Sequence, residues 1–154
     1  MIQRIFFSII PLVFMACGGG SGAEATPESF SQNVVKFATD GTKLRTLLPN
    51  DGVVDSILKC PKDSEFHKDM EKTKEKITKM NAPKEASVKY KSSTVTSRKE
   101  KKKGEKYKGC DIVSDFAVVK IDVVMELTIK DKSKEDKNGI KAITINNKWY
   151  LTGL

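Results

Sequence analysis

The feature that most constrains the fold is a run of alternating apolar residues between Phe116 and Lys130. Every second position in this run is apolar, and the positions between them include charged and polar residues. Successive side chains of a strand point to opposite faces of a sheet, so the run predicts one long strand with a buried face and a largely wet face. That pattern is typical of an antiparallel sheet. The apolar positions are Ala117, Val119, Ile121, Val123, Met125, Leu127 and Ile129.

Further strand signals surround this run. Residues 88–96 alternate and are rich in β-branched side chains, which predicts a strand. The segment Lys99–Lys108 predicts a charged hairpin loop around Gly104, and the polar segment Asp131–Gly139 predicts a turn.

Two short apolar segments, Ile140–Ile145 and Lys148–Leu151, close the chain. They flank Asn146-Asn147, and because asparagine tolerates a positive φ this pair predicts a two-residue hairpin turn. Alternation then places Trp149 and Tyr150 on opposite sides of the last strand.

Residues before Pro83 have helical periodicity instead. Thr26-Pro27-Glu28 is typical of a helix start, with a capping hydroxyl, proline in the first turn and an acid beside it. Gly41 is expected to cap the end of that helix. The expected helical segments cover residues 26–41, 44–49, 53–60 and 63–80. Helices first and strands last predict an α+β fold, with the helices packed on one face of a curved antiparallel sheet.

The amino terminus has the pattern of an export signal. Arg4 supplies a positive charge, and the apolar segment Ile5–Ala16 is shorter than the roughly 20 residues that a membrane-spanning helix needs. Cys17 follows directly, and Gly18–Gly22 form a flexible tether. These residues resemble a bacterial lipoprotein signal with its lipobox. The resemblance implies cleavage after Ala16, lipid on Cys17 and a globular part outside the cytoplasm.

Two positions depart from the family pattern: Phe14 and Met15 stand where leucine and a small residue are preferred. An ordinary signal peptide followed by a chance cysteine is therefore the alternative. Gly18 stands where an aspartate often signals inner-membrane retention, which slightly favours the outer membrane. The expected organisation is a signal peptide over residues 1–16, a lipidated cysteine and tether over 17–26, and a single α+β domain over 27–154.

With Cys17 lipidated, Cys60 and Cys110 remain. An even pair in an exported chain predicts a disulfide, because the compartment is oxidising. Two buried free thiols are the alternative. No metal site is expected, because His67 is the single histidine and no cysteine or histidine pair has the spacing of a zinc site.

The segment of residues 143–151 is similar in sequence to the final hairpin of small bacterial lipoproteins that have a nuclear-transport-factor-like, or cystatin-like, fold. Residues 40–48 are similar to the sequence segment that follows the first helix in these lipoproteins. This resemblance covers residues 27–154 and implies a cone-like packing of helices against the sheet. A different α+β roll is the alternative.

The formal net charge of +8 favours anionic neighbours such as lipid head groups or an acidic polymer. Nucleic acid is not an expected partner, because phosphate and base recognition uses arginine heavily and the chain has only Arg4, Arg45 and Arg98. The lysines of Lys99–Lys108 are candidates for contact with anionic head groups, although lysines also simply keep a hairpin soluble.

Signals of catalysis are weak. No glycine-rich phosphate loop or nucleophile elbow occurs, and no cofactor is expected. His67 lies on a polar helix face, and Trp149 suits a core better than a ligand pocket. The conceivable acid–base residues of a cone-shaped pocket are Asp111, Asp115, Tyr90 and Tyr107.

The leading hypothesis is a non-enzymatic binding or accessory domain, attached to the membrane through lipid on Cys17. An envelope protein or an anionic polymer is its expected partner. The rival hypotheses are a small-molecule enzyme or carrier with a cone-shaped pocket and a structural subunit of an envelope complex.

Overall fold

A computed structural model describes residues 26–80 and 82–154. The expected signal peptide, the tether and Cys17 lie outside the described residues. The elements in chain order are α1 (Pro27–Phe37), α2 (Gly41–Arg45), α3 (Asp51–Ile57), β1 (Leu58–Lys59), α4 (Glu65–Lys79), β2 (Ala86–Lys101), β3 (Lys106–Tyr107), β4 (Cys110–Ile112), β5 (Phe116–Ile129), β6 (Lys132–Ile145) and β7 (Lys148–Gly153).

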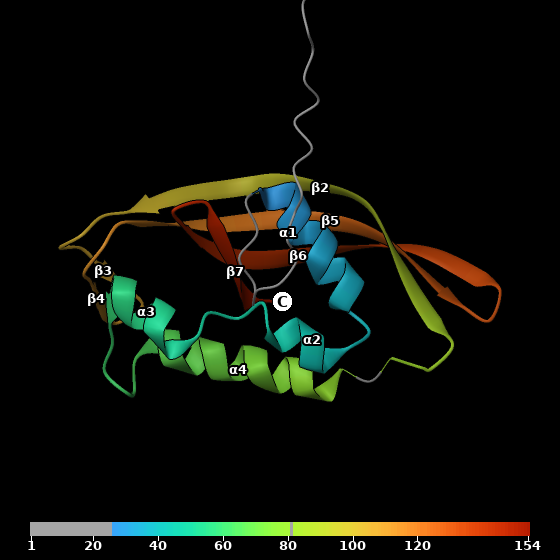
Figure 1. The fold of residues 1–154 in the computed structure, drawn as a ribbon, viewed down its shortest axis with the longest axis horizontal. Helices are drawn as coiled ribbons and strands as arrows, with labels where there is room; N and C mark the ends of the chain where they lie inside the picture. Colours follow the sequence, from blue (N-terminus) through green and yellow to red (C-terminus); the bar gives the residue numbers. More distant parts are fainter. Residues whose placement is uncertain (1–25, 81) are drawn as a thin grey trace, which may run out of the picture.

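The chain folds into an α+β structure with two antiparallel sheets (Figure 1). The larger sheet has the strand order β2-β5-β6-β7, and the smaller sheet has the order β1-β4-β3. The alternating run forms β5, which pairs with β2 on one side and β6 on the other. The α+β class expected from the sequence is therefore confirmed.

Each helix begins at a residue whose side chain accepts a hydrogen bond from the first turn. These residues are Thr26, Asp40, Asn50 and Ser64. Such caps satisfy backbone N–H groups that have no partner inside the helix. The predicted start at Thr26 is confirmed, and Ser29 completes a capping box there.

Gly41 does not cap the end of α1, as the sequence suggested. The α1 helix ends at Phe37 with Ala38 as its C-cap residue, and Gly41 is instead the first residue of α2, directly after the N-cap Asp40. A Cβ atom at Gly41 would lie 2.8 Å from the backbone oxygen of Ile77 in α4. The glycine is thus needed for the close approach of α2 to α4, and not for a helix end.

Gly41→Ala should lower the free energy of unfolding by about 1–3 kcal/mol, because overpacking forces backbone atoms apart. Urea denaturation would measure the change. Gly52→Ala is the matched control, since a Cβ there meets only the Asn50 side chain, at 3.4 Å. Alanine in the α3 helix should be neutral or stabilising by up to about 1 kcal/mol. Equal losses for the two variants would contradict the packing argument.

Two segments that the sequence assigned to loops contain strand residues. Residues 99–101 belong to β2 and residues 106–107 to β3, and these strands lie in different sheets, so the lysine-rich segment is not a hairpin loop as predicted but a short connection between the two sheets. The predicted turn over residues 131–139 is also wrong: the turn is Lys130-Asp131, both with positive φ, and β6 begins at Lys132. Residues 132–144 each pair with a residue of β5, and this backbone pairing outweighs the polar composition of the segment. The predicted turn at Asn146-Asn147 is confirmed by positive φ at both residues.

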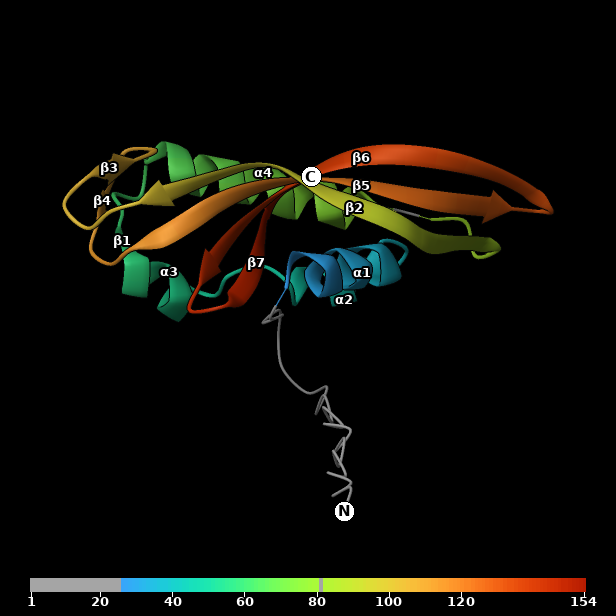
Figure 2. The same cartoon turned by 90° about the horizontal axis from the view of Figure 1, so that it is seen from above.

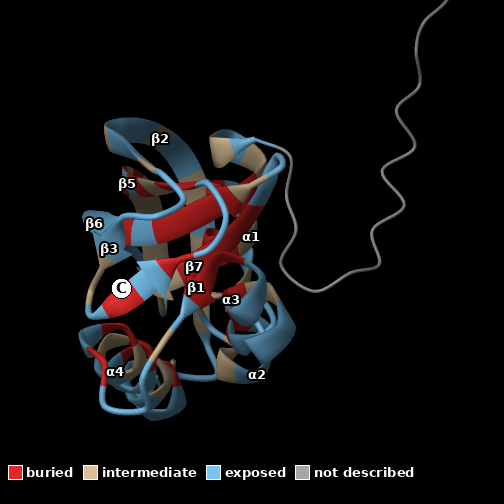
Figure 3. Cartoon of the chain, turned by 90° about the vertical axis from the view of Figure 1, so that its left-hand side faces the viewer, coloured by how far each residue is buried: buried red, intermediate tan, exposed pale blue. Residues whose placement is uncertain are grey.

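Buried apolar side chains form two clusters on opposite faces of the larger sheet. In β7, Trp149 and Leu151 belong to the first cluster and Tyr150 to the second, as alternation predicted. The first cluster takes side chains from α1 and α2, the second takes them from α3, and α4 contributes to both. Helical side chains thus cover both faces at this end of the sheet, and not one face alone. Figure 3 shows the buried residues in this region.

The other end of the larger sheet extends beyond the helices. Figure 2 shows β2, β5 and β6 continuing past α1 as a long, twisted ribbon. Along β5, burial falls from complete at Val119, Ile121 and Val123 to partial from Val124 onward. Residues 132–139 of β6 are exposed throughout. The part of β5 up to Val123 therefore contributes to the core, whereas the part from Val124 onward is only partly covered by other side chains.

Cys60 and Cys110 form the expected disulfide, with Cα atoms 4.3 Å apart. Cys60 follows β1 and Cys110 begins β4, so the bond joins neighbouring strands of the smaller sheet. Cys110 is fully buried in the second cluster. The two cysteines are 50 positions apart in the sequence, with α4 and β2 between them, and closing a loop of that length stabilises a fold by about 4 kcal/mol in the chain-entropy account.

Candidate ligand-binding cleft

A cleft of about 480 Å³ opens between the helices and the larger sheet, at the point where the core gives way to the projecting ribbon. Helices α1, α2 and α4 form one side, and β5 and β6 form the other. Its lining residues are Val34, Ala38, Leu44, Lys76, Lys79, Met80, Met125, Asn138, Gly139, Ile140 and Leu154. This volume is within the range typical of small-molecule sites. We call it the apolar cleft.

The lining combines apolar surface with two cationic side chains. Val34, Leu44 and Ile140 are buried and form the deep part, whereas Met80 is 37% exposed and lies at the surface. Lys76 and Lys79 come from the last turn of α4. Among the described residues, no Asp, Glu or His side chain takes part in the lining. Such a surface suits an apolar group and offers positive charge beside it, but it lacks a proton acceptor of the kind that acid–base catalysis uses.

The histidine singled out in the sequence has a structural role at the start of α4. His67 Nδ1 lies 2.9 Å from Ser64 Oγ and 3.0 Å from the carbonyl oxygen of Pro61. Ser64 also accepts a hydrogen bond from the His67 backbone N–H group. The ring therefore helps to fix the turn that precedes α4. It lines a separate, polar hollow of about 310 Å³ and not the apolar cleft.

The candidate acid–base residues do not meet in one site. Asp111 lies in β4, 3.9 Å from Lys106 Nζ. The Tyr90 hydroxyl lies 2.9 Å from Ser93 Oγ in β2. Tyr107 packs edge-on against Phe116, with ring centroids 5.6 Å apart, and burial raises the pKa of its hydroxyl. Trp149 packs in the core with its ring centroid 6.1 Å from that of Phe30.

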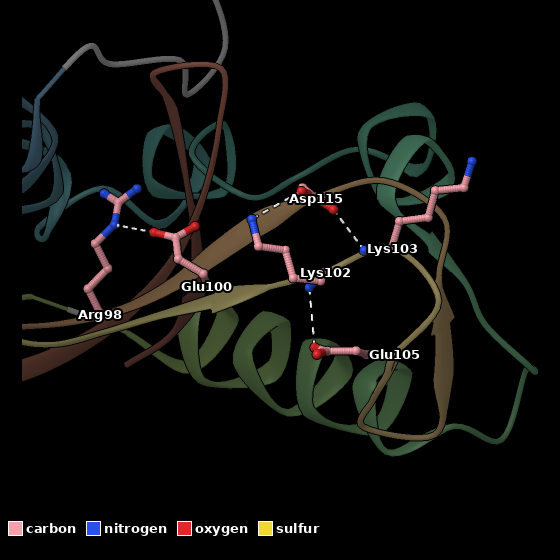
Figure 4. A network of polar contacts seen from close by, with 6 residues as sticks. All are labelled: Arg98, Glu100, Lys102, Lys103, Glu105 and Asp115. Carbon is pink, nitrogen blue, oxygen red and sulfur yellow. Dashed lines mark hydrogen bonds and ion pairs between the residues drawn. The ribbon is translucent and has the colours of Figure 1, made fainter.

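Asp115 belongs to a surface network of ion pairs and hydrogen bonds (Figure 4). Its carboxylate accepts a hydrogen bond of 2.7 Å from the Lys103 backbone N–H group and one of 3.2 Å from Lys102 Nζ. The backbone bond and then the ammonium group lower the pKa of Asp115. Glu105 accepts a bond of 3.3 Å from the Lys102 backbone N–H group. The network holds the lysine-rich turn in place, and several of its charges are already paired.

A partly buried ion pair connects α4 to the smaller sheet. The Lys108 ammonium donates a hydrogen bond to Asp69, and the Lys108 carbonyl accepts one of 3.1 Å from the Phe66 backbone N–H group. The hydrogen bond from Lys108 lowers the pKa of Asp69. Burial opposes the charge on Lys108, but its hydrogen bond and attraction to Asp69 outweigh that effect, so the pKa of Lys108 is raised. Both groups therefore stay ionised over the whole neutral range.

Within residues 26–80 and 82–154, no group of three or more His, Cys, Asp or Glu side chains is placed to hold a metal ion. In the same part of the chain, no helix has both the length and the apolar character needed to cross a membrane. Comparisons with known protein families, with curated proteins and with solved structures find no match to this chain.

Sequence reasoning missed the apolar cleft. Its lining comes from five separate elements and the last residue, Leu154, and two of its residues, Asn138 and Gly139, lie in a segment expected to be a turn. Lys76 and Lys79 looked like solvent-facing members of an amphipathic helix. Only the alternation of β5 gave a signal, because it placed Met125 on the same face as the core residues Val119 and Val123.

Proposed function

We propose that this protein is a lipid-anchored lipoprotein of the bacterial envelope whose single domain binds a ligand with an apolar body. Cys17 carries the lipid, and the domain lies outside the cytoplasm, with the outer membrane slightly favoured. The apolar run Ile5–Ala16, Cys17 itself and the tether Gly18–Gly22 support the anchor. A domain held at a membrane in this way has direct access to lipids and to envelope proteins.

The observation that carries the binding role is the composition of the apolar cleft. Buried aliphatic side chains line its depth, two lysines accompany them, and none of the described residues contributes a carboxylate or imidazole side chain. This supports binding over acid–base catalysis, so an enzyme is the less favoured reading of the same pocket. We also propose a cone-like packing of the kind found in nuclear-transport-factor-like domains. In this packing α1 and α4 form one wall of the cone, β5 and β6 form the other, and the apolar cleft is its opening.

Titration of the full chain with dodecanol, followed by calorimetry, tests the binding role. Each methylene group removed from water contributes about 0.8 kcal/mol, so a neutral chain alone is expected to bind measurably. Ala38→Trp should weaken binding by about tenfold or more, because an indole ring occupies space that the ligand needs. Ala38 lines the cleft and is only half-buried, so the variant is expected to fold.

Thr39→Trp is the matched control. It introduces the same ring one residue later, at an exposed position that does not line the cleft. Circular dichroism melting would check that both variants are folded. Absence of dodecanol binding to the wild type, or equal weakening by both substitutions, would refute the proposed role of the cleft.

A further inference from the structure

A second, polar cleft adjoins the apolar cleft on the other side of Leu154. It has a volume of about 130 Å³ and lies between α4, the Lys108 turn and the ends of β6 and β7. Its lining residues are Asp69, Lys72, Thr73, Lys76, Lys108, Lys141, Thr152, Gly153 and Leu154. We call it the lysine cleft. The two clefts share Lys76 and Leu154, so one ligand can extend from one into the other.

Two of the four lysines that line the lysine cleft, Lys72 and Lys141, have no anionic partner in the part of the chain that the structure describes. Among the described residues, Asp69 is the one acidic side chain of the lining, and it is bound to Lys108, while Lys76 is bonded to the Leu154 oxygen. Lys72 and Lys141 lie near enough to Asp69 for their charges to lower its pKa. Among the described residues, neither has a carboxylate within 4.0 Å of its Nζ atom. Several like charges converging on a concave surface attract a multivalent anion.

The walls of the lysine cleft are fixed to each other. The Asp69–Lys108 pair joins α4 to the turn before β4. The Thr73 hydroxyl, which is buried, lies 2.9 Å from the Asp69 carbonyl oxygen and 3.2 Å from that of Thr152 in β7. Lys76 Nζ donates a hydrogen bond of 2.9 Å to the Leu154 carbonyl oxygen at the boundary of the two clefts. A site on such connected elements is largely formed before a ligand arrives, which reduces the entropic cost of binding.

We infer that the ligand is a single-chain amphiphile with a phosphate-like head group, its chain in the apolar cleft and its head in the lysine cleft. Lysine ammonium groups bind phosphate as point charges, and a dianionic head makes better use of several lysines than a carboxylate does. This inference rests on the proposed function, because it assigns the chain of the ligand to the apolar cleft.

Three probes test the inference on the full chain: dodecyl phosphate, dodecanol and inorganic phosphate, each titrated by calorimetry below the micelle concentration. Dodecyl phosphate should bind about tenfold or more tightly than dodecanol, since Lys72 and Lys141 attract an anionic head group but not a neutral hydroxyl. Inorganic phosphate should bind far more weakly than dodecyl phosphate. Raising the salt concentration should weaken the binding of dodecyl phosphate and leave dodecanol unchanged.

Charge-removing variants locate the head group. The double variant Lys72→Gln/Lys141→Gln should remove most of the preference for dodecyl phosphate and leave dodecanol binding within about twofold. Lys79→Gln tests whether the head group instead binds inside the apolar cleft, because Lys79 lines that cleft and not the lysine cleft. Lys68→Gln is the matched control, since it removes one exposed charge from the same helix, away from both clefts. It should change neither affinity.

The outcomes separate this inference from the proposed function. Equal affinity for dodecyl phosphate and dodecanol would overturn the head-group site but would still support binding of an apolar chain in the apolar cleft. Loss of the preference in Lys79→Gln but not in the double variant would also overturn it. Inorganic phosphate binding as tightly as dodecyl phosphate would show a free-phosphate site and reject the spanning ligand. If neither amphiphile binds, the proposed function fails together with the inference.

Discussion

Replacing Cys17 with alanine should shift the protein from the membrane fraction to an unprocessed or soluble form. The thiol of Cys17 is the atom to which the lipid would be attached, and an alanine cannot take its place. Two or three acyl chains, each contributing about 0.8 kcal/mol per buried methylene, make attachment effectively stable, so the expected effect is close to all or none. Membrane fractionation followed by immunoblotting would measure it.

Intact-mass analysis gives an independent readout of the same prediction. Wild-type protein extracted from membranes should begin at Cys17 and carry the added mass of acyl groups. The control is the double variant Cys60→Ala/Cys110→Ala, which removes the disulfide and should leave any mature chain lipidated. If Cys17→Ala protein fractionates and migrates like the wild type, the lipoprotein proposal is wrong.

Ile121→Ala should lower the free energy of unfolding by about 2–5 kcal/mol, the usual cost of a cavity in a well-packed core. Ile121 is 1% exposed in the centre of β5 and belongs to the cluster that also contains α1 and β7 residues. It pairs with Val95 of β2 and Ile140 of β6, so its side chain has neighbours on both adjoining strands. Urea denaturation monitored by Trp149 fluorescence would measure the loss.

The neighbouring residue supplies the control. Lys120 lies on the opposite face of β5 and is itself exposed, and Lys120→Ala should cost no more than about 0.5 kcal/mol. Leu127→Ala, in the half-buried part of the same strand, should fall between the two values. Equal and small effects for Ile121→Ala and Lys120→Ala would mean that the assignment of β5 faces is mistaken.

The sequence predicted those parts of the fold that short-range chemistry determines. Strict alternation identified β5 and its buried face, Thr26-Pro27 gave the start of α1, and the Asn146-Asn147 pair gave the last hairpin turn. Each of these signals lies within a few residues of the feature it predicts. Helical periodicity likewise placed α4 within residues 63–80.

Features that depend on distant partners were not predictable. Residues 132–139 are polar and carry no strand signal, yet they form a strand because β5 offers them a complete set of backbone partners. Gly41 was taken for a helix cap because its contact with Ile77 depends on the packing of α2 on α4. Both clefts arise only where elements far apart in the chain converge, so no local pattern could place Lys76 beside Leu154.

The projecting ribbon of β2, β5 and β6 is expected to open before the rest of the domain. Its strands are held by backbone hydrogen bonds near water, with little apolar cover beyond Val123, and such regions exchange their amide hydrogens through local opening long before a protein unfolds. Met125 and Asn138 lie at the root of this ribbon and line the apolar cleft. We expect such opening to widen the cleft mouth while Ile121 and Trp149 stay packed, which would give the proposed ligand a way in that leaves the core undisturbed.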